Sequence, residues 1–170
     1  MGSFQGYQDK VGEGTLSPMF FAFAVLAAGI AGDMDLALEI GREGLRQYAD
    51  DGAILVNTGA VLEYRGENEA AQDYYERAVK QEPVVPQAHK ALGDQALRSG
   101  DKARAKAQYE LAVKADPRLG EDVYIKLGAI ALENSETAEA GAMWRRALEL
   151  NPENHTLQAK LEQLGASAGA

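Results

Sequence analysis

The chain has no cysteine, two histidines and one tryptophan among its 170 residues. Without cysteine it can form neither a disulfide nor a thiolate zinc site, and it has no thiol redox chemistry. The two histidines, His89 and His155, lie too far apart in the sequence for a metal-ligand motif. No serine stands in a Gly-x-Ser-x-Gly context, and no Gly-Lys-Ser/Thr loop is present. The sequence therefore predicts no enzyme, no metal and no cofactor.

Basic residues are also scarce, with 17 Lys and Arg against 26 Asp and Glu and a net charge of −9. Binding to nucleic acid in general needs basic side chains that displace counterions from phosphates, so no nucleic-acid partner is expected. Apolar residues make up 46% of the chain and charged residues 25%, which is typical of a protein that folds in water. One structural unit is the expected organisation.

The chain also lacks a long hydrophobic run. Its one candidate, the uncharged segment 19–31, is too short to cross a bilayer. Residues 1–17 hold Asp9, Lys10 and Glu13, so the segment has no basic lead-in of the kind that precedes a secretory signal. We interpret 19–31 as a helix of the fold, expect no direct membrane span, and favour a cytoplasmic location.

Residues 1–17 show no helical periodicity, and Met1-Gly2-Ser3 is typical of a vector-encoded start. This segment and the small-residue tail, 165–170, are expected to be flexible.

A five-residue phrase repeats along the rest of the chain. Its positions are occupied by Gly, Ala, an aromatic residue, Ala and Pro. The three copies are Gly59, Ala71, Tyr75, Ala78 and Pro83; Gly93, Ala105, Tyr109, Ala112 and Pro117; and Gly128, Ala140, Trp144, Ala147 and Pro152. The first two copies are 34 residues apart, and the third is shifted by one residue that we place at Gly120. A fixed period of this length predicts repeated helical hairpins.

Aligning the copies gives the blocks 18–51, 52–85, 86–119 and 121–154. In the third block, the first helix is predicted over Pro86 to Arg98 because proline is tolerated in a first helical turn. Ser99-Gly100-Asp101 then turns the chain, and a second helix is predicted over Lys102 to Ala115. Each block is expected to contain two such helices.

The order of small, aromatic and proline positions resembles the tetratricopeptide repeat family. The resemblance implies an all-α fold: an α-solenoid of four helical hairpins that winds as a right-handed superhelix. A last helix from about Asn154 to Leu164 resembles the capping helix of such arrays and places three leucines on one stripe. The first block matches weakly. It has Val25, Gly41, Gly44 and Ala49 where the others have Gly, an aromatic residue, Ala and Pro.

Within each hairpin, the glycine and the first alanine are predicted to let the two helices approach closely. The aromatic residue, such as Tyr109 in block three, is predicted to fill the space towards the next hairpin. His89 is interpreted as a packing residue.

By the same resemblance, the first helix of each hairpin lines a concave face on which partners bind. A spacing of three to four residues then selects the exposed stripe of each first helix. The stripe comprises Met19, Ala22 and Leu26; Ala53, Val56, Asn57, Ala60 and Tyr64; Gln87, Lys90, Asp94 and Arg98; and Asp122, Ile125, Ala129 and Glu133.

Some family members bind a partner's terminal carboxylate with a set of Lys, Asn and Arg side chains. Here only Asn57 matches, because Ala22 and Leu26 precede it and Gln87 and Ala91 follow it. Binding of chaperone C-terminal tails is therefore disfavoured. Block three carries a net charge of +3 between acidic blocks, and Lys90 with Arg98 is the basic pair left on the predicted stripe.

The first helix is unusually apolar for one hairpin, since it contains three of the chain's four phenylalanines. Phe20 and Phe23 are candidates for self-association. The excess apolar surface could instead be covered by residues 1–17 or by a neighbouring domain.

The leading hypothesis is a non-enzymatic protein-interaction module that holds a partner's peptide or helix in the concave groove. Two alternatives stay open: a homo-oligomeric scaffold that assembles through the first helix, and the regulatory repeat region of a larger enzyme.

Overall fold

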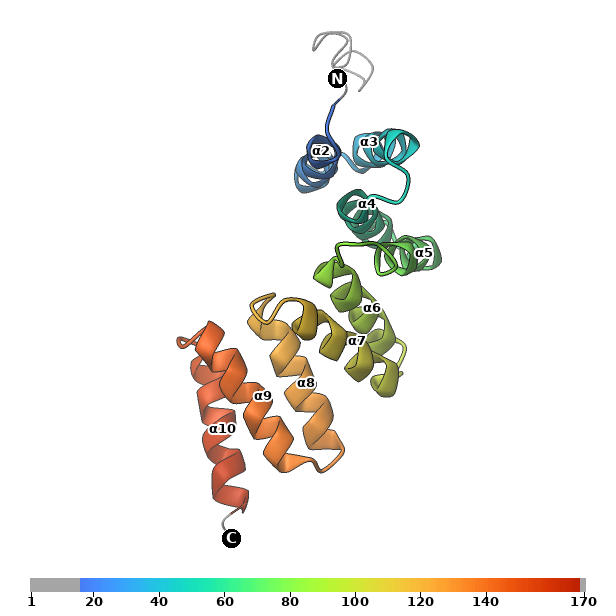
Figure 1. The fold of residues 1–170 in the computed structure, drawn as a ribbon. Coiled ribbons are helices and arrows are strands. Elements are labelled where there is room, and N and C mark those ends of the chain that lie inside the picture. The colour runs from blue at the N-terminus through green and yellow to red at the C-terminus, as the bar shows by residue number, and fades with distance from the viewer. Residues whose placement is uncertain (1–15, 169–170) are drawn as a thin grey trace. The chain divides into compact units, whose positions relative to one another are not determined.

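In a computed structural model of the protein, the structure describes residues 16–168, with side chains up to residue 165. Of the N-terminal segment predicted to be flexible, only residues 16 and 17 are among those described. The tail, 165–170, was also predicted to be flexible, but it continues the last helix as far as Ala168, beyond the predicted end at Leu164. The described part is entirely helical, as predicted (Figure 1). The helices are α2 (Pro18–Ile30), α3 (Met34–Gln47), α4 (Gly52–Tyr64), α5 (Asn68–Ala78), α6 (Pro86–Arg98), α7 (Lys102–Ala115), α8 (Glu121–Glu133), α9 (Thr137–Leu150) and α10 (His155–Ala168).

The chain divides into two compact units, whereas its composition predicts one. Unit 1 ends at Ala88, and unit 2 begins at His89. In repeat folds, stacked hairpins bury their apolar faces against their neighbours and need no core common to all of them. A repeat array can therefore divide into units where a single-core domain of this length would not.

A glycine-acid pair turns the chain between the two helices of each of the first three hairpins. Gly32, Gly66 and Gly100 all have φ of +83°, a left-handed conformation that favours glycine. At the first turn, Asp33 N–H donates to the Ala28 carbonyl at 3.0 Å, and the Asp33 side chain accepts from the first turn of α3. The same pair thus ends one helix and begins the next. Ser135 takes the glycine's place in the fourth hairpin, with φ of +65°.

The repeated glycine and the repeated aromatic residue pack against each other within one hairpin. A Cβ added to Gly93 would lie 2.6 Å from the Tyr109 ring, and one added to Gly128 would lie 2.3 Å from Trp144 Nε1. The aromatic residue therefore fills the space that the glycine leaves in its own hairpin. The sequence predicted only that this glycine lets the two helices approach closely. Tyr109 also packs in a cluster with Val123 and Leu127 of α8, as predicted for contact with the next hairpin.

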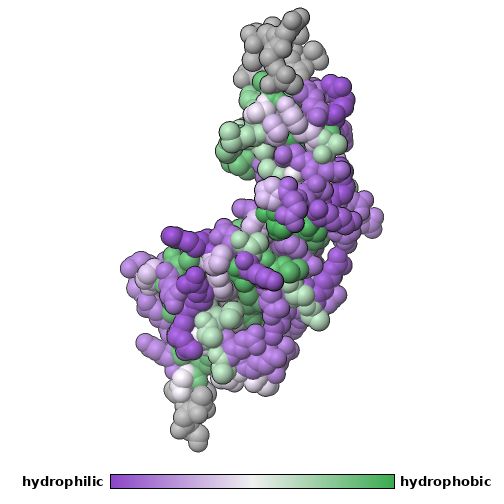
Figure 2. Space-filling view, in the orientation of Figure 1, coloured by the Kyte–Doolittle hydropathy of each residue, from purple (hydrophilic) through white to green (hydrophobic). Residues whose placement is uncertain are grey.

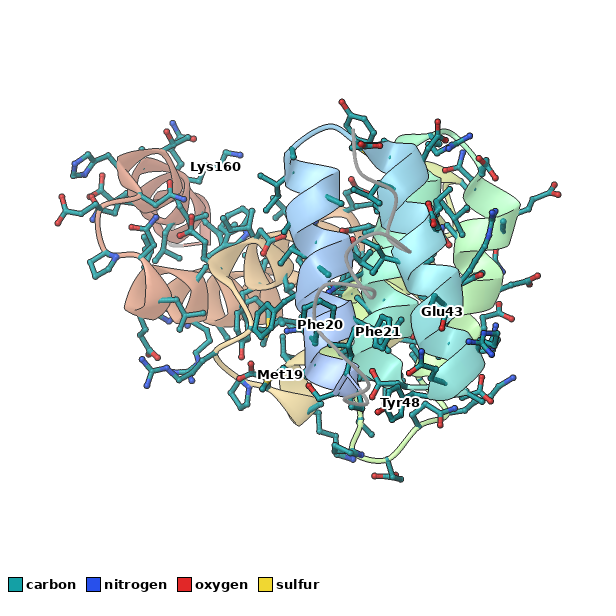
Figure 3. All side chains as sticks on the ribbon, turned by 90° about the horizontal axis from the view of Figure 1, so that it is seen from above. Met19, Phe20, Phe21, Glu43, Tyr48 and Lys160 are labelled. Carbon is teal, nitrogen blue, oxygen red and sulfur yellow. The ribbon has the colours of Figure 1, made fainter. Side chains whose placement is uncertain are left out.

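The first hairpin uses different residues for the same packing. Phe21 and Val25 of α2 are fully buried. Gly44 on α3 leaves room for the Phe21 ring, because a Cβ there would lie 2.8 Å from Phe21 Cβ. Figure 3 shows Phe20, Phe21 and Tyr48 gathered where α2 begins and α3 ends. The rings of Phe20 and Phe21 meet edge to face with centroids 5.8 Å apart. The weakly matching block is thus a hairpin like the others.

The last helix, α10, covers the fourth hairpin as predicted. Leu157 is buried against Trp144 and Ala147 of α9, and Leu161 and Leu164 pack on the same cluster. Asn154 begins the helix, since its side chain accepts a hydrogen bond from Leu157 N–H at 3.0 Å.

Candidate functional site

A groove runs between α2 and α4 in unit 1, where the concave face was expected. Its volume is about 370 Å³. The floor and walls are almost wholly apolar and come from Val25, Leu26, Gly29, Ile30, Gly32, Met34, Asn57, Ala60, Val61 and Tyr64. We call this surface the α2/α4 groove.

Large apolar side chains stand exposed along the groove. Tyr64 is 79% exposed, Ile30 80% and Leu26 45%. Figure 2 shows a hydrophobic patch over α2 among hydrophilic surface. Exposed apolar side chains that gather on one surface are typical of a docking site.

Four of the residues predicted for the stripe line this groove: Leu26, Asn57, Ala60 and Tyr64. Met19 and Ala53 are exposed on the same two helices, and Val56 is half-buried. Ala22 is buried, with 6% of its surface exposed. Of the two candidates for self-association, Phe23 is 63% exposed, whereas Phe20 is half-buried beside Phe21.

Asn57 fixes the spacing of the groove. Its Nδ2 donates to the Ala22 carbonyl at 2.8 Å and so ties α4 to α2. The one side-chain amide of the groove lining thus makes a contact inside the protein. What the lining offers a ligand is mainly apolar surface.

Sequence reasoning did not assign the other lining residues to the site: Val25, Gly29, Ile30, Gly32, Met34 and Val61. A signal for Ile30 was present, since it lies 34 residues before Tyr64 and so holds the same repeat position. Met34 carries no such signal because it belongs to α3, a second helix of a hairpin.

Three of the predicted residues of unit 2, Lys90, Asp94 and Asp122, form a charge network with Lys126. Lys90 Nζ lies 2.9 Å from Asp122 and 3.7 Å from Asp94. Lys126 Nζ lies 2.6 Å from Asp94 and 3.3 Å from Asp122, and Tyr109 OH donates to Asp94 at 2.6 Å. The two lysines and two aspartates therefore neutralise one another. Lys90, expected to face a partner, is engaged inside the protein.

The network changes the acidity of its members. Burial alone would raise the pKa of Asp122, but the hydrogen bond and charge of Lys90 outweigh it and lower that pKa. Burial would likewise lower the pKa of Lys90, but Asp122 and Asp94 outweigh it and raise that pKa. Burial, together with the bond to Asp94, raises the pKa of Tyr109. Each shift favours the form that keeps the network intact.

Two other basic residues of block three are also paired. Lys102 forms an ion pair with Glu133, and Lys106 lies 3.1 Å from both Glu136 and Glu139. The third hairpin, with a net charge of +3, thus lies against acidic residues of the fourth. The basic island that suggested a partner is largely matched by contacts between hairpins.

The remaining predicted positions are placed as follows. Gln87 is exposed at the start of α6, and Arg98 is exposed at its end. Ile125 is half-buried on α8. Ala129 and Glu133 line a second cavity of about 670 Å³ between α8, α9 and α10, with Leu132, Thr137, Trp144, Lys160, Gln163 and Leu164. Lys160 of α10 is labelled in Figure 3.

His89 is half-buried, and its Nδ1 lies 2.8 Å from Gln108 Oε1, which agrees with its interpretation as a packing residue. Over residues 16–168, no group of three His, Cys, Asp or Glu side chains could hold a metal ion. Over the same residues, no helix is both long and apolar enough to cross a bilayer.

Three solved structures illustrate the likeness in fold. A pilF structure from Pseudomonas aeruginosa is 18% identical, with a TM-score of 0.76 over 90% of this chain and 71% of that one. A MamA crystal structure is 16% identical, with a TM-score of 0.70 over 89% of this chain and 82% of that one. The first TPR of Spaghetti (RPAP3) bound to the HSP90 peptide SRMEEVD is 21% identical, with a TM-score of 0.60 over 72% of this chain and 96% of that one.

A search of curated proteins gave no match. The tetratricopeptide repeat family model matches residues 57–120, which span the second and third predicted blocks. The match agrees with the glycine-aromatic packing and the turns described above. The resemblance to the tetratricopeptide repeat family that the sequence predicts is therefore confirmed for residues 57–120.

Proposed function

We propose that this protein is an interaction module that binds the apolar face of a partner's peptide or helix in the α2/α4 groove. The observation that carries the proposal is the exposure of Leu26, Ile30 and Tyr64 around an apolar hollow. A partner that covers such a side chain fully gains about 1.5–3 kcal/mol from each. The peptide-bound Spaghetti structure supports the proposal, since a protein of the same fold binds a peptide.

The chemistry of the groove favours an amphipathic segment over a charged tail. Its lining has no charged side chain, and its one amide, Asn57, already donates to Ala22. A partner with apolar residues at helical spacing would fill the hollow, because such residues form one face of a helix. The predicted residues of unit 2 enter the proposal as a secondary polar surface, to which Arg98 and Glu133 would contribute.

The experiment selects helical peptides from a display library against the full chain. The selected peptides are then measured on the double variant Ala60→Gln/Tyr64→Gln, which puts polar groups in the groove without changing the net charge. Apolar residues at i, i+3 or i+4, and i+7 are expected in the selected peptides. We expect the double variant to bind them at least about tenfold more weakly, which corresponds to ~1.4 kcal/mol.

Leu111→Asp provides the control. Leu111 is 43% exposed on α7, close to the 45% of Leu26, but it lies outside the groove. This variant should bind the peptides as the unchanged protein does. Equal binding by the double variant and the unchanged protein would remove the groove from the proposed function.

A further inference from the structure

A stripe of four exposed apolar residues runs along α2. Met19 is 66% exposed, Phe23 63%, Leu26 45% and Ile30 80%. Steps of four, three and four residues keep side chains on one side of a helix. Leu26 and Ile30 also line the α2/α4 groove, whereas Met19 and Phe23 lie outside it. We call these four residues the α2 stripe.

The α2 stripe is free of charge, and so is the rest of its helix. Residues 18–30 contain no Asp, Glu, Lys or Arg, in a chain whose net charge is −9. In a two-fold pairing each surface meets a copy of itself, so a surface whose charges are all of one sign would face like charges. An uncharged helix avoids that repulsion, and α2 therefore suits a second copy of itself.

The spacing of the stripe also suits a two-fold pairing. The steps four, three and four read the same in both directions. When two α2 helices lie antiparallel, Met19 faces Ile30 of the other copy, and Phe23 faces its Leu26. We propose that the protein forms a two-fold dimer in which the α2 stripes of two copies pack antiparallel.

The small size of the stripe determines the affinity that we expect for the dimer. A helix of 13 residues is about 20 Å long, and its face is smaller than the ~800 Å² per partner of a stable complex. The dimer is therefore weak, with a dissociation constant on the order of 10–100 μM. Both copies carry a net charge of −9, so added salt screens their repulsion and strengthens the pairing.

The dimer would compete with the proposed function, because both use Leu26 and Ile30. Different variants can still test the two proposals independently. Phe23 belongs to the α2 stripe but not to the groove lining, whereas Tyr64 lines the groove from α4. Phe23→Asp therefore tests the dimer, and Ala60→Gln/Tyr64→Gln tests peptide binding.

The experiment is sedimentation equilibrium of the full chain from about 10 to about 300 μM, at low and high salt. The unchanged protein and the control Leu111→Asp should shift from monomer towards dimer as concentration rises, more strongly at high salt. Phe23→Asp should weaken association at least about tenfold and keep its helical circular dichroism. A monomer throughout the range, or a dimer that Phe23→Asp does not weaken, overturns the proposal. A monomer would assign the stripe to another occupant, such as residues 1–15 or a different protein.

The absence of cysteine allows a direct test of the antiparallel register. Met19→Cys and Ile30→Cys are made in separate chains and then mixed under mild oxidation. The mixed sample should form more disulfide-linked dimer than either variant alone, because the pairing brings residue 19 of one copy to residue 30 of the other. Equal or greater cross-linking within either single variant overturns the antiparallel arrangement.

Discussion

At the scale of single residues, the repeat phrase reflects close packing between a glycine and an aromatic ring. Trp144 lies over Gly128, and its Nε1 donates to the Ile125 carbonyl at 3.3 Å. The sequence alone identified the glycine and aromatic positions of the repeat, because both recur in register. It could not predict that they touch, since that contact depends on how the two helices are rotated about their axes.

Gly128→Ala should destabilise the protein by about 2–3 kcal/mol, because the new methyl group would overlap the Trp144 indole. Urea unfolding followed by the fluorescence of the single tryptophan measures the loss. Gly165→Ala is the matched control, since a Cβ at that helical glycine meets nothing within 4 Å. It should leave stability unchanged or raise it by up to about 1 kcal/mol. Equal midpoints for the two variants would contradict the packing argument.

Ser135 occupies a left-handed position that three other hairpins give to glycine. Replacing it with glycine should stabilise the protein by about 0.5–1 kcal/mol, because φ of +65° is strained for a residue with a Cβ. The reverse change, Gly100→Ser, should destabilise by a similar amount. Thermal melts of both variants test the pair, and a lower melting temperature for Ser135→Gly would refute it.

At the scale of helices, local signals placed the elements well. The predicted ranges Pro86–Arg98 and Lys102–Ala115 match α6 and α7, because proline, Gly-Asp and a second proline mark their ends within the sequence. Contacts between hairpins were not predictable in this way. The charge of +3 on block three suggested a partner, but it is largely matched by acidic residues of the fourth hairpin, to which no local signal linked it.

Lys90→Glu should therefore affect folding before binding. It would place a third carboxylate beside Asp94 and Asp122 and cost about 1–2 kcal/mol of stability. Lys160→Glu, at an exposed position on α10 of the same unit, is the control and should cost less than about 0.5 kcal/mol. Urea midpoints at low and high salt measure both, and high salt should reduce the loss. Equal losses would show that the network contributes nothing to stability.

The same network predicts a dependence on pH. The pKa of Asp122 is lower in the folded protein, so its contribution is complete above about pH 4 and is lost as the pH falls through the folded pKa. The pKa of Lys90 is higher when folded, so its contribution is lost only as the pH rises beyond about 10.5. Between these limits the network stays formed.

Asp122→Asn should accordingly lose less stability than the unchanged protein when the pH falls from about 5 to about 3. The difference should stay below about 1 kcal/mol, since the carboxylate is partly exposed. Urea midpoints across this range measure it. Parallel curves for the two proteins would contradict the role given to Asp122.

At the scale of the whole molecule, the two units offer a partner different surfaces. The first helices of unit 1 expose apolar side chains, whereas those of unit 2 carry charges that pair with one another. Both kinds of surface occupy the same positions of the repeat, which the sequence alone described as one continuous stripe. Affinity for an apolar segment should therefore come from unit 1.

Because each hairpin packs against its neighbours only, a local lesion should remain local. Gly128→Ala removes packing inside the fourth hairpin, so its effect on amide hydrogen exchange should decrease along the chain. We expect protection to fall by about 30–150-fold in α8, α9 and α10, which is ~2–3 kcal/mol, and by less in α7. Protection in α2 to α5 should be unchanged. Hydrogen exchange resolved by peptide mass spectrometry makes this comparison, and an equal loss of protection in all helices would mean that the two units unfold as one.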